Sequence, residues 1–187
     1  MRRTNGKRSE SFMRFFTPEL FIRFGSNDDE EADRANDEWE AAIDSYERHL
    51  TPIKKKLPQS AVPLTETSFH DWEFLMFDTN NPSTIKVFPL KKKFHSASLY
   101  LQSGDQVADL FYVLCAGVRE QLGRRHKEFG TGTKIWLYDE IHRYDKVPDS
   151  FVHRILWSDG METEIPFYTA FVHTFPVHET RSTGKAS

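Results

Sequence analysis

The sequence predicts an α+β fold, in which N-terminal helices pack on one face of a largely antiparallel, meandering β-sheet of five to seven strands. Apolar residues recur at helical spacing in the first third of the chain, whereas short β-type runs separated by turn residues fill the remainder. No helix-sized segment separates the expected strands. This arrangement favours antiparallel neighbours over crossover connections.

We expect the folded part to begin with a short helix over residues 18–24. Thr17 can cap its first turn, Pro18 suits its first helical position, and Gly25 can end it. Residues 1–12 are basic and show no periodic pattern, so a flexible extension is expected there, and residues 173–187 are expected to form a flexible tail. A single domain is therefore predicted over residues 13–172.

The clearest element is an amphipathic helix that Ser26 can cap. Its apolar stripe advances in steps of three and four residues through Ala32, Ala35, Trp39, Ile43, Tyr46 and Leu50. Ten acidic and two basic residues give positions 26–50 a charge of −8, and the remaining 18 acidic and 23 basic residues give +5. Pro52 interrupts the stripe, but Ile53 and Leu57 continue it, which predicts a kink or a second helical turn.

The β-type runs begin after a proline-containing connector, residues 54–67, that has room for one helical turn. They are residues 69–78, 85–90, 91–102, 107–118 and 134–144, followed by a hairpin from 151 to 171. The polar, glycine-containing segment 119–133 is interpreted as a loop, and the chain after Phe171 as the start of the tail.

The hairpin is predicted to turn at Asp159-Gly160, because this pair favours a two-residue type I′ turn with positive φ at both positions. That turn places Trp157 opposite Glu162. One face would then be mainly apolar and would meet the core.

Arg154 falls on this core-facing side, which predicts either a partner for it or a position at the rim of the sheet. The other face would carry His153, Trp157, Glu162 and Glu164, with His153 and Glu164 as diagonal neighbours. A half-solvated sheet face, in which aromatic rings cover the carbon stems of the carboxylates, explains the same pattern without any site.

On the strand over 134–144, Glu140 and His142 would share one side and could approach His153 if this strand pairs with 151–157. These residues define a candidate binding face: Glu140, His142, His153, Trp157, Glu162 and Glu164. A metal site needs three or four converging ligands, and the hairpin alone supplies one histidine.

Other polar motifs carry less information. His70 and Asp71 are adjacent on an expected strand, so they point to opposite faces and are expected to bond backbone groups. Cys115, the only cysteine, lies in an apolar run and is expected to be a small buried residue. The chain contains no zinc-binding, nucleophile-elbow or phosphate-loop motif, so we assign no catalytic, metal or cofactor-binding residue.

We therefore expect a non-enzymatic domain that binds an unknown protein or small ligand. One alternative is a hydrolase-like or metal-assisted enzyme that uses His70, His142, His153 and nearby carboxylates. Another is weak nucleic-acid binding through the basic runs at 54–56, 91–93 and 124–127, which a net charge of −3 disfavours. No apolar run approaches the roughly 20 residues of a membrane helix, and a single cysteine suits a reducing, cytoplasmic setting.

Three parts of the chain carry a resemblance to a family. They are the "MRFFTPEL" stretch with the acidic, tryptophan-containing helix that follows it, the His70-Asp71 dipeptide, and the C-terminal part with "WLYDEI" and the "HRILWSDG" hairpin. All three are similar to those of an uncharacterised bacterial family with a domain-of-unknown-function label. The resemblance covers about half of the chain and implies a bacterial source, a compact domain with Met13 as its ordinary start, and no particular reaction.

Overall fold

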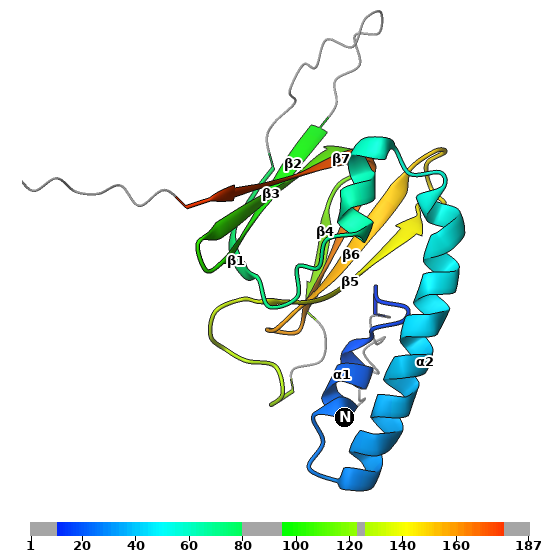
Figure 1. The fold of residues 1–187 in the computed structure, drawn as a ribbon, viewed down its shortest axis with the longest axis vertical. Helices are drawn as coiled ribbons and strands as arrows, with labels where there is room; N and C mark the ends of the chain where they lie inside the picture. Colours follow the sequence, from blue (N-terminus) through cyan, green and yellow to red (C-terminus); the bar gives the residue numbers. More distant parts are fainter. Residues whose placement is uncertain (1–10, 80–94, 123–125, 178–187) are drawn as a thin grey trace, which may run out of the picture.

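The computed structural model describes residues 11–79, 95–122 and 126–177 (Figure 1). Helices come first and a curled antiparallel sheet follows, so the predicted α+β class is confirmed. The helices of the described part are α1 (Pro18–Phe24), α2 (Asp29–Lys54) and the 3-10 helix η1 (Gln59–Thr65). Its strands are β1 (Glu73–Asp78), β2 (His95–Ser103), β3 (Gln106–Leu114), β4 (Arg119–Leu122), β5 (Trp136–Arg143), β6 (Phe151–Trp157) and β7 (Met161–Pro176).

Both α-helices begin at a side-chain cap. Thr17 accepts a hydrogen bond from the backbone N–H of Leu20 at 3.2 Å, and α1 has the predicted bounds. The cap predicted for α2 is wrong, because Asp28 accepts from the N–H of Glu30 at 3.1 Å. Ser26 lies two residues before this cap, and its hydroxyl accepts from the N–H of Asp28.

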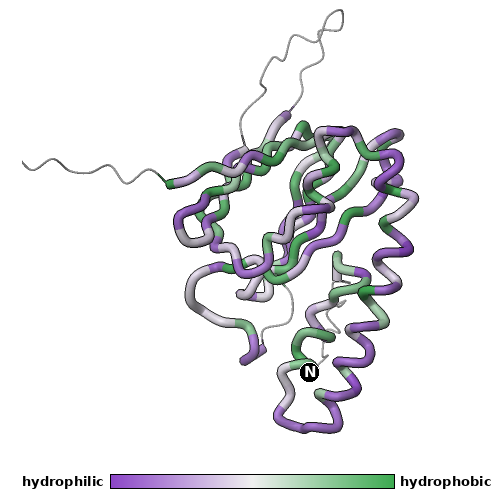
Figure 2. Tube along the Cα trace, in the orientation of Figure 1, coloured by the Kyte–Doolittle hydropathy of each residue, from purple (hydrophilic) through white to green (hydrophobic). Residues whose placement is uncertain are grey.

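The apolar stripe of α2 is largely as predicted. Figure 2 shows a helix that is hydrophilic along most of its length, beside strands with many more hydrophobic positions. Pro52 is accommodated within the last turn, and Ile53 and Leu57 beyond it are buried. Ile43 is an exception, since 39% of it is exposed and Ala42 packs at this level of the helix instead.

The sheet has the order β1-β2-β3-β7-β6-β5, with β4 paired to β7. Strand β7 joins the two halves, because its beginning pairs with β6 and its end pairs with β3. The expected meander is therefore broken after β3. The predicted tail is wrong up to residue 176, because Val172 lies opposite Leu110 and Pro176 lies opposite Gln106 in regular antiparallel pairing.

Three other expectations are corrected at their margins. Residues 69–72 precede β1 and are not part of the strand, and residues 119–122 form β4 within the predicted loop. The expected extension also ends earlier than predicted, because Ser11 and Phe12 bond to Glu162. The expected strand at 85–90 and the basic run at 91–93 lie outside the described residues.

Within the described residues, the core consists of two clusters. The larger one joins η1 and the end of α2 to the sheet, and includes Ile53, Leu64, Trp136, Trp157 and Phe167. Helix η1 lies against β7, where the hydroxyls of Ser60 and Thr169 are 2.7 Å apart. The smaller cluster is Met13, Phe16, Phe129, Leu137 and Leu156, which Trp39 and Tyr46 of α2 cover. Helix α2 therefore runs beside the β5 edge of the sheet (Figure 1).

The hairpin of β6 and β7 differs from the prediction by one residue of register. Ser158, Asp159 and Gly160 connect the strands, and positive φ occurs at Gly160 (+79°) and not at Asp159. The N–H of Gly160 bonds to the carbonyl of Trp157, and the Asp159 carboxylate accepts from the N–H of Met161. This is the three-residue hairpin that closes with a glycine bulge, so the type I′ assignment was wrong.

Candidate functional site

The one-residue shift in the hairpin redistributes the predicted face. Arg154 lies opposite Glu164, and Leu156 lies opposite Glu162, so both glutamates share a face with Arg154. His153 lies opposite Ile165 on the other side of the sheet. The six predicted residues therefore do not form one face, and a one-residue change of register is sufficient to separate them.

His153 and Trp157 belong to the larger core cluster and its immediate surroundings. The imidazole of His153 contacts the Tyr112 hydroxyl at 2.9 Å and the Asp139 carboxylate at 3.0 Å, and the side chain is fully buried. The indole N–H of Trp157 donates to the hydroxyl of Thr163 at 2.8 Å. Both polar groups are satisfied inside the protein.

Glu162 and Glu164 use their carboxylates to hold other parts of the chain. Oε2 of Glu162 accepts from the hydroxyl of Ser11 at 2.8 Å and from the N–H of Met13 at 3.1 Å. Glu164 pairs with Arg119 of β4 and, at 3.2 Å, with Nε of Arg154. The partner expected for Arg154 is therefore Glu164.

Strand β5 pairs with β6, as the prediction required, and sends Glu140 and His142 to the side opposite His153. Glu140 is fully buried, and its carboxylate is surrounded by the backbone of the N-terminal segment. The N–H groups of Arg14, Phe15 and Phe16 donate to it at 2.9, 2.6 and 2.8 Å.

Burial by itself would raise the pKa of Glu140. The hydrogen bonds from His142 and from the three backbone N–H groups outweigh that effect, so the pKa is lowered and the group is a carboxylate.

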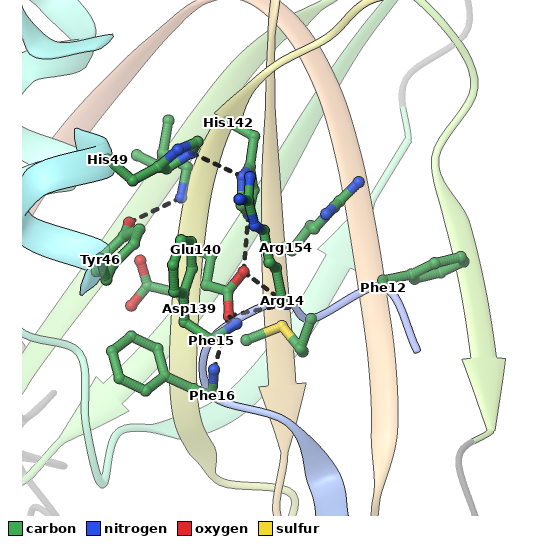
Figure 3. A network of polar contacts seen from close by, with 12 residues as sticks. Phe12, Arg14, Phe15, Phe16, Tyr46, His49, Asp139, Glu140, His142 and Arg154 are labelled. Carbon is green, nitrogen blue, oxygen red and sulfur yellow. Dashed lines mark hydrogen bonds and ion pairs between the residues drawn. The ribbon is translucent and has the colours of Figure 1, made fainter. Parts of the chain in front are cut away.

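A chain of three side chains runs outward from this carboxylate (Figure 3). Nε2 of His142 lies 2.7 Å from Oε2 of Glu140, and Nδ1 of His142 lies 2.9 Å from Nε2 of His49 on α2. Tyr46, one turn earlier on α2, accepts from the N–H of Ile141 at 2.8 Å and so holds the helix against β5. His142 is almost completely buried, whereas His49 is half-buried.

His49 opens into a hollow of about 370 Å³ between α2, the N-terminal segment and the β5 edge. We call this hollow the basic pocket. Its lining residues are Arg14, His49, Pro52, Ile53, Lys56, His142, Arg143, Asp145 and Arg154. Among the residues that the structure describes, four permanent cations thus surround the pocket against one carboxylate.

The cations of the basic pocket are only partly neutralised by the protein. Arg143 lies 3.7 Å from the exposed Asp149, Arg154 shares Glu164 with another arginine, and the Arg14 guanidinium lies over the ring of Phe15. The exposed Lys56 ammonium makes no ion pair with any residue in the described ranges. The pocket therefore keeps a positive potential.

The local charges also affect His49. Burial lowers its pKa first, positive charge on His142 when that ring is protonated and on Arg14 lowers it further, and Glu140 opposes them. At neutral pH the ring is therefore mainly uncharged. It can accept a proton if negative charge enters the basic pocket.

Sequence reasoning identified Glu140 and His142 and missed His49, Arg14, Lys56 and Arg143 as their neighbours. His49 does stand next to the apolar stripe, three residues after Tyr46, which was the available signal. The hydrogen bond between His49 and His142 joins residues 93 positions apart, and no local pattern predicts it.

The other motifs are accounted for locally. Nδ1 of His70 bonds to the carbonyl of Leu137 at 2.6 Å, in agreement with the backbone role expected for this motif. Cys115 is half-buried just after β3, and burial raises the pKa of its thiol. Within residues 11–79, 95–122 and 126–177, no three histidine, cysteine or acidic side chains are grouped to hold a metal ion.

Comparisons with known proteins identify no relative of this chain. No protein-family model, no curated protein and no solved structure matches this chain. In the described part of the chain, none of the helices combines the length and apolar character that crossing a membrane requires.

Proposed function

We propose that this protein is a non-enzymatic domain that binds a small anionic ligand in the basic pocket. The observation that supports this most directly is the set of four permanent cations, Arg14, Lys56, Arg143 and Arg154, around one hollow of about 370 Å³. That volume lies at the lower end of the range for small-molecule pockets, which is about 300–1,000 Å³. The size of the pocket therefore favours a small-molecule ligand over a macromolecular partner.

The cations come from separate parts of the chain, which argues for a built site. Arg14 belongs to the N-terminal segment, Lys56 follows α2, and Arg143 and Arg154 lie on β5 and β6. Bringing like charges together costs electrostatic energy. An anion in the pocket would remove this cost and would bind with charge-assisted hydrogen bonds.

The test is a thermal-shift screen of the full chain with small anions: phosphate, sulfate, phenyl phosphate, benzoate, citrate and mononucleotides. A ligand that binds only the folded state raises the melting temperature, and the increase grows with the ratio of ligand concentration to Kd. We expect at least one of these anions to raise it, and uncharged benzyl alcohol to leave it unchanged. If none of the anions raises the melting temperature, the proposal is wrong.

A matched pair of lysines localises the binding. Lys56 lines the pocket, whereas the equally exposed Lys55 does not. We expect Lys56→Gln to weaken anion binding by about fivefold, because an exposed ion pair contributes about 1 kcal/mol. Lys55→Gln should bind like the unmodified protein. Equal affinities for the two variants would place the ligand elsewhere.

The Glu140–His142–His49 chain favours a second candidate, a hydrolase-like enzyme that uses His49 as a general base. A carboxylate that orients an imidazole is a common arrangement in acid–base catalysis. Hydrolysis of p-nitrophenyl phosphate or p-nitrophenyl acetate distinguishes the two functions. Turnover that is lost in His49→Gln and kept in His95→Gln, which changes an exposed histidine of β2, would favour the enzyme.

A further inference from the structure

We infer that the ligand of the basic pocket carries a phosphoryl group, and that His49 takes up one proton when this group binds. The inference rests on the proposed anion-binding function and adds to it a ligand class and a proton-linked residue. It is drawn from the hydrogen-bond chain that ends in the pocket and from the arrangement of the four cations.

When both imidazoles are neutral, the hydrogen bonds determine where the protons of the chain lie. Backbone N–H groups can only donate, and three of them point at the Glu140 carboxylate, which is therefore the acceptor of the chain. Nε2 of His142 consequently carries the hydrogen of its contact with Glu140. A neutral His142 then accepts at Nδ1 from Nε2–H of His49, which leaves Nδ1 of His49 without a proton.

The two imidazoles can hold only one positive charge between them. If both rings were protonated, both nitrogens of the 2.9 Å contact between His49 and His142 would carry hydrogens, and the contact would be lost. One added proton at Nδ1 of His49 keeps every hydrogen bond in place. The buried Glu140 carboxylate then balances that charge through His142.

Several titratable or charged groups face His49. His142 and Glu140 face it from β5, Arg14 from the N-terminal segment and Arg154 from β6. The cations outnumber the carboxylate, so protonation is disfavoured while the pocket lacks an anion. An anion that neutralises the cations reverses this balance and raises the proton affinity of His49.

Together, the other residues that line the pocket also disfavour protonation of His49 in the absence of an anion. Lys56 and Arg143 add two positive charges, and Asp145 adds one negative charge. The Phe15 ring lies 5.3 Å from the His49 ring and carries no charge, and Tyr46 on the same helix is bonded to β5. Ligand binding is thus the event that changes the net charge around His49 most.

A phosphoryl group suits the cations better than a carboxylate does. A phosphate monoester carries a charge close to −2 above pH of about 6 and has three acceptor oxygens that point in different directions. The cations of the pocket likewise approach from different elements, as Figure 3 shows for Arg14 and Arg154. A carboxylate has two oxygens in one plane and suits a single arginine fork.

The coupling between ligand binding and protonation of His49 has a definite sign. The phosphoryl group raises the pKa of His49 in the complex above its value in the free protein. Binding is therefore tightest below the pKa of the free protein and weakens as pH rises through the pKa of the complex. Phenyl phosphate is a suitable probe between pH 7 and 8.5, because it stays a dianion there and does not itself contribute to the trend.

The experiment is isothermal titration calorimetry of the full chain with phenyl phosphate at pH 7.5, in two buffers of different ionisation enthalpy. The difference between the observed enthalpies measures the protons taken up per ligand bound. We expect an uptake approaching one proton for the unmodified protein and for His95→Gln. In His49→Gln we expect uptake near zero and binding weaker by about fivefold, the effect of one lost charge contact.

Each failure has a distinct meaning. Binding of phenyl phosphate by the unmodified protein without proton uptake would overturn the role of His49, and no variant is needed for that measurement. Benzoate that binds as tightly as phenyl phosphate would overturn the phosphoryl class. In both cases, if Lys56→Gln still weakens binding, the proposed anion-binding function is supported. If the protein binds none of the anions, both the proposed function and the inference about His49 are wrong.

Discussion

Substitution of Glu140 by glutamine changes one buried group and its charge while keeping the side-chain shape. Four donors converge on the carboxylate: the N–H groups of Arg14, Phe15 and Phe16, and Nε2 of His142. Hydrogen bonds to a charged acceptor contribute about 1.5–3 kcal/mol each, and bonds to a neutral one about 0.5–1.5 kcal/mol. The loss of charge therefore costs about 1 kcal/mol per donor, or about 4 kcal/mol in all. The amide NH2 group that replaces one oxygen also cannot accept from the donors on that side.

Two structural terms limit this cost. A neutral amide does not pay the desolvation of a buried charge, which offsets about half of the loss. The N-terminal segment can also detach, and this forfeits the burial of Met13 and Phe16, which are 4% and 8% exposed. Burial of such side chains stabilises by about 1.5–3 kcal/mol each, so the two together set an upper bound of about 3–6 kcal/mol. We expect Glu140→Gln to destabilise the protein by about 2 kcal/mol.

The assay is urea unfolding followed by tryptophan fluorescence, because Trp136 and Trp157 are buried. Glu47→Gln is the control, since Glu47 is exposed on α2, and its effect should stay within about 0.5 kcal/mol. The comparison is then repeated at lower pH. The folded pKa of Glu140 is lowered from 4.5, so its stabilisation is complete above that pH and disappears as pH falls through the folded value.

Two results would refute this reasoning. Equal stability of the Glu140 and Glu47 variants at pH 7 would mean that the carboxylate does not hold the N-terminal segment. A difference from the unmodified protein that stays constant between pH 7 and 3.5 would mean that it arises from packing and not from charge.

Three further substitutions test the hairpin and the placement of α2. Gly160→Ala and Gly104→Ala both put a side chain at positive φ, but a Cβ at Gly160 would lie 2.9 Å from Cδ2 of Phe129, and one at Gly104 would meet nothing within 4 Å. Urea unfolding should show a loss of about 1 kcal/mol for Gly104→Ala and about 2 kcal/mol more for Gly160→Ala, and equal losses would contradict the contact. Tyr46→Phe leaves the N–H of Ile141 without its acceptor and should cost about 1–2 kcal/mol, whereas a loss below about 0.5 kcal/mol would show that the bond does not hold α2 against β5.

The elements that sequence analysis predicted well are those whose signals lie within a few residues. Helix α1 has the predicted bounds because the Thr17 hydroxyl, the Pro18 ring and Gly25 act on the backbone immediately around them. The stripe of α2 and the alternation of β5 are equally local, since side-chain direction follows from the period of the element.

The register of the β6–β7 hairpin could not be predicted in the same way. Asp159-Gly160 fits both a two-residue and a three-residue turn, and the two differ little in local energy. Burial selects between them: the observed register puts His153 and Ile155 on the same side as Ile165, and leaves Glu162 and Glu164 on the side of Arg154. The error of one residue moved the two glutamates to the wrong face.

By itself, the sequence determined the order of helices and strands, their periods and the polar side chains that each one could present. Only the tertiary structure decided which of those side chains meet. His49 reaches His142, and Arg14 reaches the basic pocket, because α2 and the N-terminal segment dock on the β5 edge through Phe16 and Trp39. That docking depends on apolar burial between distant segments, which is non-directional and leaves no local signature at the residues it brings together.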